Sequence, residues 1–143
     1  MHAFNVITLF AVLTLVGVES SVSVFIHPAA ARLAPDAQLT IISRVARVLG
    51  QVMPIWYPLC AVLFGIETRF FWQDAARAVL LVADAIWVLT SLASIVFLVP
   101  LNNRVAEGAA DWQQLHRTWD GRHRVRIVAL ASSALLLLWV VAR

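Results

Sequence analysis

The chain has 143 residues, of which 62% are hydrophobic and only 13% are charged, and its mean hydropathy is +0.84. Soluble domains usually carry about a quarter charged residues, so this chain lacks the polar surface that water would require. Its formal charge is +3, and no basic run interleaved with aromatic residues argues for nucleic-acid binding. We therefore expect a single integral membrane domain over residues 1–143, with no nucleic-acid partner.

Four apolar runs are long enough to cross a bilayer, which takes roughly 20 predominantly apolar residues. They cover about residues 4–26, 48–67, 76–99 and 125–142. The first run resembles a signal peptide, because "PAAARLA" offers small residues for cleavage, but no basic residue precedes it, so we expect a retained helix. The sequence predicts an all-α, four-helix transmembrane bundle.

Both long connections are expected to extend the helices at the cytoplasmic side. Asp36 after Pro35 is an N-cap candidate, and "AQLTIISRVARVLG" places apolar residues at helical spacing with arginines on the other face. The segment "AADWQQLHRTWDGRHRVR" has the same character before the fourth run. Both are interpreted as interfacial helices that lead into the next span.

The distribution of arginine predicts the orientation. Every one of the 11 basic side chains is arginine, and the connections after the first run and before the fourth carry eight of them: Arg32, Arg44, Arg47, Arg104, Arg117, Arg122, Arg124 and Arg126. The other side has Arg69, Arg77 and Arg143. Positive residues favour the cytoplasm, so both termini are expected outside it, with a bacterial inner membrane as the setting.

The first run contains a charged residue, Glu19, followed by Ser23 and His27 on roughly the same helical face. A carboxylate at this depth must be paired, neutral or in contact with a wet cavity. One interpretation is a structural bond, or an ion pair with an arginine of a loop. The other is a role in a binding or catalytic pocket. His27, beside Pro28, marks the end of the helix at the interface.

The second and third runs carry fewer signals. Pro54 and Pro58 each remove a backbone donor, so the second helix is expected to bend. Cys60 is the only cysteine, which excludes an intrachain disulfide. Asp84 is expected to be structural, paired with Arg77 or with a tryptophan or serine donor.

The stretch "VPLNNRVAEG", residues 99–108, follows the third run. Pro100 is expected to end the helix, and Asn102 and Asn103 to cap its exposed carbonyl groups. Arg104 then lies at the cytoplasmic surface, level with Glu19.

The last helix has the densest pattern of polar and aromatic residues. Helical spacing places these residues in one stripe: Trp112, His116, Trp119, His123 and Arg126. Asp120 lies beside the stripe. A histidine can move protons and an arginine can hold an oxyanion, while anchoring at the membrane edge is the simpler alternative. The candidates for metal ligands are Glu19, His27, His116, Asp120 and His123.

Three separate helices thus bring polar residues to one depth, which favours a shared pocket over unrelated caps. The members of this set are Glu19, Asn102, Asn103, Arg104, His123 and Arg126.

The motif "VPLNNRVA", with the tryptophan, histidine and arginine residues that follow it, resembles the anthrone oxygenase family of small four-helix membrane proteins. The match covers the final third of the chain and is carried by Pro100, Leu101, Asn102, Asn103, Arg104, Trp112, Trp119, His123 and Arg126. The resemblance implies oxidation of an anthrone-type substrate by molecular oxygen, with Asn103, Arg104, His123 and Arg126 as pocket residues. It does not identify the substrate.

The expected function is oxygenation of a hydrophobic phenolic or aromatic molecule at the cytoplasmic end of the bundle. Catalytic candidates are Glu19, Asn103, Arg104, His123 and Arg126, and substrate contacts are expected from Asn102, Trp112 and Trp119. The cofactor is open between none and a single metal ion. Lipids are expected partners, and a homo-oligomer is a further alternative. Other hypotheses are a non-enzymatic lipid or quinone binder, a subunit of a membrane complex, or a small transporter, although no internal repeat supports the last.

Overall fold

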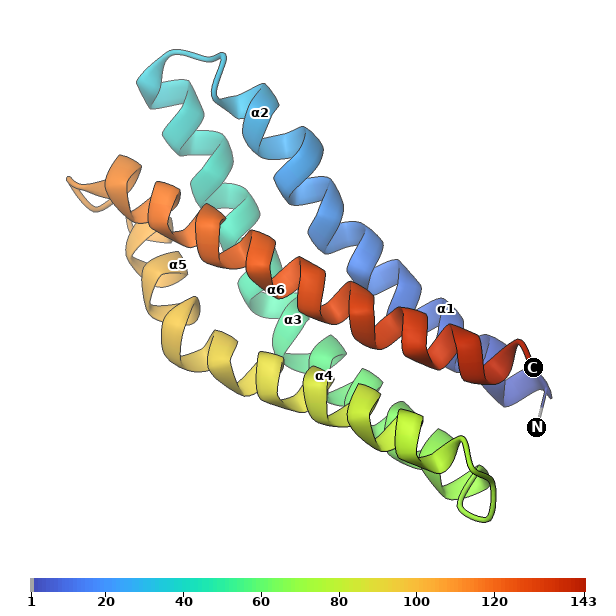
Figure 1. Cartoon of the computed structure of the whole chain (residues 1–143). Helices are drawn as coiled ribbons and strands as arrows, with labels where there is room; N and C mark the ends of the chain where they lie inside the picture. Colours follow the sequence, from blue (N-terminus) through green and yellow to red (C-terminus); the bar gives the residue numbers. More distant parts are fainter. Residues whose placement is uncertain (1) are drawn as a thin grey trace.

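The computed structural model describes residues 2–143, which form helices joined by short loops (Figure 1). In chain order these are α1 (His2–Ser21), the π-helical turn η1 (Val22–Ile26), α2 (His27–Ala30), α3 (Pro35–Phe70), α4 (Arg77–Phe97), α5 (Val99–Ala106) and α6 (Trp112–Val141). Residues 2–143 contain no strand, so the all-α class is confirmed.

Four helical segments are long and apolar enough to cross a membrane: His2–Ala30, Pro35–Phe70, Arg77–Phe97 and Trp112–Val141. Two of them are considerably longer than the apolar runs, because the arginine-bearing segments before residues 48 and 125 continue the helix of each span. Large apolar side chains project from their outer faces, as at Phe10 and Ile55, which are 72% and 73% exposed. The chain is therefore an all-α bundle of the integral membrane type.

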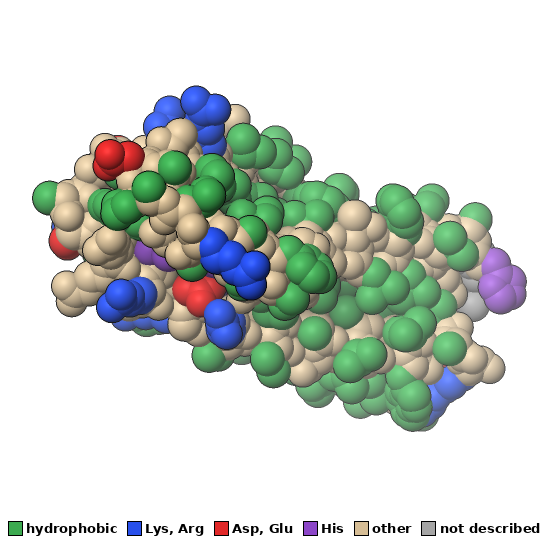
Figure 2. All heavy atoms as spheres, turned by 90° about the horizontal axis from the view of Figure 1, so that it is seen from above, with side chains coloured by type: hydrophobic (Ala, Val, Ile, Leu, Met, Phe, Trp, Pro, Cys, Tyr) green, Lys and Arg blue, Asp and Glu red, His purple; other side chains and the backbone are tan. Residues whose placement is uncertain are grey.

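The two ends of the bundle differ in charge. Both termini lie together at one end, beside the loop of residues 71–76, and we call this the terminal end (Figure 1). The opposite end carries the loops of residues 31–34 and 107–111 together with α5 and most of the arginines, and we call it the arginine-rich end. Figure 2 shows charged side chains gathered at this end, while hydrophobic side chains cover much of the remaining length.

The main apolar core fills the half of the bundle toward the terminal end. Trp87 of α4, Phe64 of α3 and Leu137 of α6 are fully buried there. Smaller apolar clusters lie toward the arginine-rich end, one around Trp119 and another around Trp112. The other half lies toward the arginine-rich end and contains the buried ion pair described below, and we call it the polar half.

The helices of the polar half are irregular. The first span widens into the π-helical turn η1, where the backbone N–H of His27 bonds to the carbonyl of Val22, five residues back. Turns of this kind recur at functional sites. In α3, Pro54 and Pro58 lie inside the helix, which nevertheless runs unbroken from Pro35 to Phe70.

The sequence expectation for the end of α4 is wrong. Pro100 was expected to end the third helix, but α4 ends at Phe97 and Pro100 occupies the first turn of α5, where a missing N–H costs nothing. The helix α5 ends at Ala106, and Gly108 follows with a φ of 76°, which allows the N–H of Ala109 to bond to the carbonyl of Arg104 at 3.1 Å.

Asp84 was expected to pair with Arg77 or a donor group. Arg77 instead donates to the carbonyl of Trp72 at 3.2 Å and covers its ring. The Oδ1 atom of Asp84 is buried and has no hydrogen-bond partner within residues 2–143.

Candidate functional site

A buried network of charged and polar side chains surrounds Glu19, which is 0% exposed. Its Oε1 accepts a hydrogen bond from the hydroxyl of Tyr57 at 2.7 Å. Its Oε2 accepts one from Nη2 of Arg126 at 2.5 Å. The carboxylate of α1 is thus held between α3 and α6, and the ion pair satisfies the condition for a charge within the membrane.

His123 completes the network, and its partners define its proton positions. Its Nε2 lies 3.1 Å from the backbone carbonyl of Glu19, which can only accept. Its Nδ1 lies 2.8 Å from Nη2 of Arg126, which can only donate. Nδ1 also lies 3.3 Å from Oε2 of Glu19. The shorter contact with the Arg126 donor favours the neutral tautomer with the proton on Nε2, and both ring nitrogens have partners.

Arg126 joins the network to an open space. Its Nη2 bridges Glu19 and His123, and its guanidinium lies 5.6 Å from the ring centroid of Tyr57. Its Nε is buried but has no hydrogen-bond partner within residues 2–143. The side chain is only 11% exposed, so this N–H requires an acceptor that a ligand can supply.

That space is a cavity of about 260 Å³ between the helices of the polar half. Most of its wall is apolar, with Met53, Ile95 and Trp119 among the lining residues. The polar side chains in the wall are Glu19, Tyr57, Ser91, Ser94, Asn102, Asn103 and Arg126. A mostly apolar cavity with a few converging polar groups is the usual form of a small-molecule site.

The mouth of the cavity lies partly on the apolar flank of the bundle. Pro54, Pro58 and Ile95 line the cavity and are also exposed, Ile95 to 60%. Val99 and Asn103 of α5 are exposed lining residues as well, so the opening is bordered by α3, α4 and α5. The prolines and Ile95 are apolar, so part of this opening lies on the apolar flank.

The structure brings together some of the expected catalytic residues and separates others. Glu19, Asn103 and Arg126 line the cavity. His123 lies behind Arg126 and is not part of the wall. Arg104 lies elsewhere: it is 55% exposed and forms an ion pair with Asp111 at 3.0 Å.

The residues expected to contact substrate divide in the same way. Asn102 and Trp119 line the cavity, and Trp119 stacks on His123 with 4.4 Å between ring centroids. Trp112 does not line it, because its ring is buried in the apolar cluster with Leu115 and Ala30 at the arginine-rich end.

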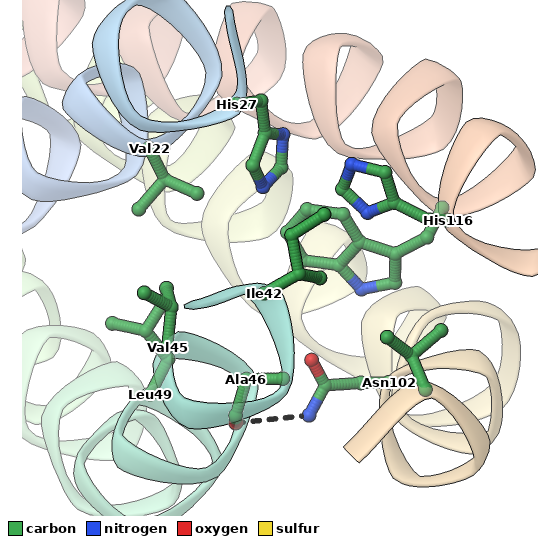
Figure 3. A pocket seen from close by; sticks show the side chains of 10 residues that line it. Val22, His27, Ile42, Val45, Ala46, Leu49, Asn102 and His116 are labelled. Carbon is green, nitrogen blue, oxygen red and sulfur yellow. Dashed lines mark hydrogen bonds between the residues drawn. The ribbon is translucent and has the colours of Figure 1, made fainter. Parts of the chain in front are cut away.

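The paired asparagines have different roles. Asn102 donates from Nδ2 to the carbonyl of Ala46 in α3 at 3.1 Å and so joins α5 to α3 (Figure 3). Asn103 faces the cavity and makes no such bond. Neither of them caps α4, which corrects the expectation from sequence, because both lie inside α5.

The metal-ligand candidates form two separate groups. Glu19 and His123 belong to the buried network, whereas His27 bonds through Nδ1 to Asp120 at 2.7 Å. The rings of His27 and His116 point toward one another beside a gap of about 20 Å³, room for roughly one water (Figure 3). Within residues 2–143, no three His, Cys, Asp or Glu side chains are arranged to hold a metal ion.

Sequence reasoning missed three polar residues of the cavity wall: Tyr57, Ser91 and Ser94. A signal existed for Tyr57, since it is the only tyrosine of the chain and lies in an apolar run, where a buried hydroxyl needs a partner. No such signal existed for the two serines. Each donates to a carbonyl of its own helix four residues back, Ser91 to Trp87 and Ser94 to Thr90. Serines in helices commonly make this bond, so they require no partner from another helix.

The fold and site define a class of protein: a four-helix membrane-type bundle with a buried carboxylate–guanidinium pair at an apolar cavity. Neither a protein-family model, nor a curated protein, nor a solved structure matches the chain significantly.

Proposed function

We propose that the chain is a membrane enzyme that binds a planar, hydrophobic phenol or anthrone-type ketone in the cavity and oxidises it with molecular oxygen. The observation that carries this proposal is the side chain of Arg126, which stands at an apolar cavity with a buried N–H lacking a partner. A phenolate or enolate oxygen is the acceptor that this position favours. The likeness to anthrone oxygenases adds support, since Asn103, Trp119 and Arg126 belong to both the motif and the wall.

The proposed reaction begins at the carboxylate of Glu19. This group takes a proton from the acidic methylene of the substrate, and Arg126 stabilises the enolate oxygen that forms. The electron-rich carbon then forms a bond to molecular oxygen, and the peroxide anion takes back the proton held by Glu19. The hydroperoxide loses its second C–H proton and, as the O–O bond breaks, hydroxide, which together leave as water. The balance is one methylene and one O₂ giving one carbonyl group and one water.

In this proposal His123 is a positioning residue. The sequence favoured it as the proton acceptor, but its Nδ1 already accepts from Arg126 and its Nε2 already donates to the carbonyl of Glu19. Its contribution is to hold the guanidinium and the backbone of α1 at Glu19 in place. The proton acceptor is therefore Glu19, which reaches the cavity itself.

The test is oxygen consumption by the purified protein with an added anthrone. Glu19→Gln removes the base while keeping the bond from Tyr57, and we expect a loss of at least about 100-fold in rate, as for removal of a general base. The matched control is Asp84→Asn, which neutralises another carboxylate that does not line the cavity. Equal rates for Glu19→Gln and the wild type contradict the proposed mechanism.

The same assay separates the enzyme from a non-catalytic binder of quinone or lipid. A binder would retain an aromatic ligand in a manner sensitive to Arg126 but would consume no oxygen. Binding without turnover by the wild type would therefore replace the oxygenase proposal with the binding function.

We also propose that the arginine-rich end faces the cytoplasm, with both termini outside, in a bacterial inner membrane. Support comes from the eight arginines of the two long connections against three elsewhere. A single cysteine placed at Glu107 or near the C-terminus, in a Cys60→Ala background, reports its side by labelling with an impermeant thiol reagent. Labelling of a cysteine at position 107 from outside intact cells would contradict this orientation.

A further inference from the structure

A second concave surface lies on the outside of the bundle, between the first span and α3. It is a groove of about 660 Å³ with a mainly apolar lining, and its lining residues include Thr14, Gly17, Val18 and Ile26 on one side and Val45 and Val48 on the other. Gly17 has no side chain to fill the groove, and a Cβ built there meets no atom within 4 Å. The groove is therefore a preformed channel on a surface that the fold directs toward lipid.

Arg44 lies in the groove at its arginine-rich end. The side chain is exposed and takes part in none of the ion pairs within residues 2–143. An unpaired guanidinium at the head of an apolar groove matches an anionic head group attached to an apolar chain.

The length of the groove fits one leaflet of a bilayer. From Thr14 to Ile26 the helix advances roughly 18 Å, at about 1.5 Å per residue. Half of a hydrocarbon core of about 30 Å is roughly 15 Å. An acyl chain lying along the groove therefore spans the leaflet on the arginine-rich side, with its head group beside Arg44.

A second copy of the chain is a poorer occupant. Gly17 and Ser21 have the spacing of small residues found at helix–helix contacts. The only acidic residue in residues 2–30 is Glu19, which is buried and paired with Arg126. Two copies joined through their first spans would thus leave Arg44 without a counter-charge from that span, whereas a lipid phosphate supplies one.

We propose that this groove binds an anionic phospholipid, with one acyl chain over Gly17 and the phosphate at Arg44. The site is distinct from the cavity at Arg126 and does not depend on the proposed oxygenase activity.

The test measures phospholipid retained by the full-length protein in native mass spectrometry, after addition of phosphatidylglycerol or phosphatidylcholine. The wild type is expected to retain phosphatidylglycerol preferentially. Arg44→Gln should weaken this binding about five-fold, the effect of one basic residue near an anionic lipid surface. Gly17→Leu should reduce retention of both lipids, because the new side chain fills the groove where there is no protein atom to clash with.

Two control variants match these changes elsewhere on the surface. Gly65→Leu places the same side chain at another exposed helical glycine with open space around it, and Arg32→Gln removes another exposed arginine at the same end. Both should bind lipid like the wild type. Circular dichroism checks that each variant is folded. If Gly17→Leu does not fold, the lipid binding of Arg44→Gln alone tests the proposal.

Equal retention of the two lipids by the wild type would overturn the proposal, as would phosphatidylglycerol binding that is unchanged in Arg44→Gln. A Gly17→Leu variant that converts a dimer to a monomer while lipid binding persists would also overturn it, and would assign the groove to a second copy.

Discussion

The two halves of the bundle use the same helices in different ways. Toward the terminal end the helices are regular and enclose a continuous apolar core, in which Ser133 bonds to the carbonyl of Ala83 at 2.7 Å. Two carboxyl groups are also buried there, that of Glu67 and in part that of Asp84, but no buried ion pair is among the described contacts of this half. In the polar half the first span widens, α3 contains two prolines and α4 breaks at Leu98. The same half contains the buried ion pair of Glu19 and Arg126 and the cavity.

The coincidence of irregular helices with the buried ion pair and the cavity is informative. Regular apolar packing stabilises a fold, whereas a buried ion pair is weak evidence for stability because removing two charges from water costs several kcal/mol per ion. We infer that the terminal half supplies the stability and that the polar half is arranged around a ligand. The variants below test this division.

The largest effect is expected for Arg126→Ala. It leaves the carboxylate of Glu19 buried without its cation, which should lower the free energy of unfolding by about 3–5 kcal/mol. Reversible unfolding in mixed micelles, followed by helical circular dichroism, measures the loss. The double variant Glu19→Ala/Arg126→Ala should be more stable than the single one, and additive losses would show that the two charges are not coupled.

A loss of about 2–5 kcal/mol is expected for Leu137→Ala, because this side chain is fully buried in the main core and its removal leaves a cavity. Binding of an aromatic ligand, measured at a temperature where the variant is folded, should be unchanged. A large change in ligand affinity would show that the two halves are not independent.

Smaller effects are expected for the paired asparagines, which separate stability from ligand binding. Asn102→Ala removes the bond to the carbonyl of Ala46 and should cost about 1 kcal/mol of stability. Asn103→Ala should leave stability unchanged and weaken ligand binding by roughly five-fold, since a hydrogen bond to the ligand is worth about 1 kcal/mol. Thermal melts and ligand titrations on both variants test this, and the reverse assignment of effects would contradict the structure.

The smallest effect is expected for Arg104→Ala. Its ion pair with Asp111 is exposed, at 55% and 48%, and such pairs contribute about 0–1 kcal/mol. Stability and oxygen consumption should both stay close to those of the wild type. A strong loss of activity would return Arg104 to the site, as the sequence motif implied.

Composition and apolar run length were sufficient to predict the four-helix class, because a bilayer imposes a minimum length on each span. The pairing of Glu19 was foreseeable for a related reason, since a carboxylate inside an apolar helix requires a partner. The sequence could not identify that partner as Arg126 of α6 or add Tyr57, because partners far apart in the chain depend on packing.

The error at residues 102–104 has a geometric cause. We treated these residues as a polar cap in which all three side chains share one wall, but they lie in a helix, where successive side chains point about 100° apart. Asn102 thus bonds to α3, Asn103 lines the cavity and Arg104 turns toward solvent. The break at Leu98 that makes this possible has no clear signal in the sequence beyond Pro100.

The wide turn η1 sets the phase of the first span. Glu19 and His27 are eight residues apart, which in a regular α-helix would place them about 80° apart around the axis. A π-helical turn absorbs one extra residue, so the spacing behaves like seven residues and the offset shrinks to about 20°. Both side chains of the first span can then face α6, Glu19 at Arg126 and His27 at Asp120. If one residue were deleted from residues 22–26, a regular α-helix would keep the contacts of Glu19 and His27 with α6. The π-helical turn therefore behaves like one inserted residue, which the helix accommodates while both side chains stay on the face toward α6.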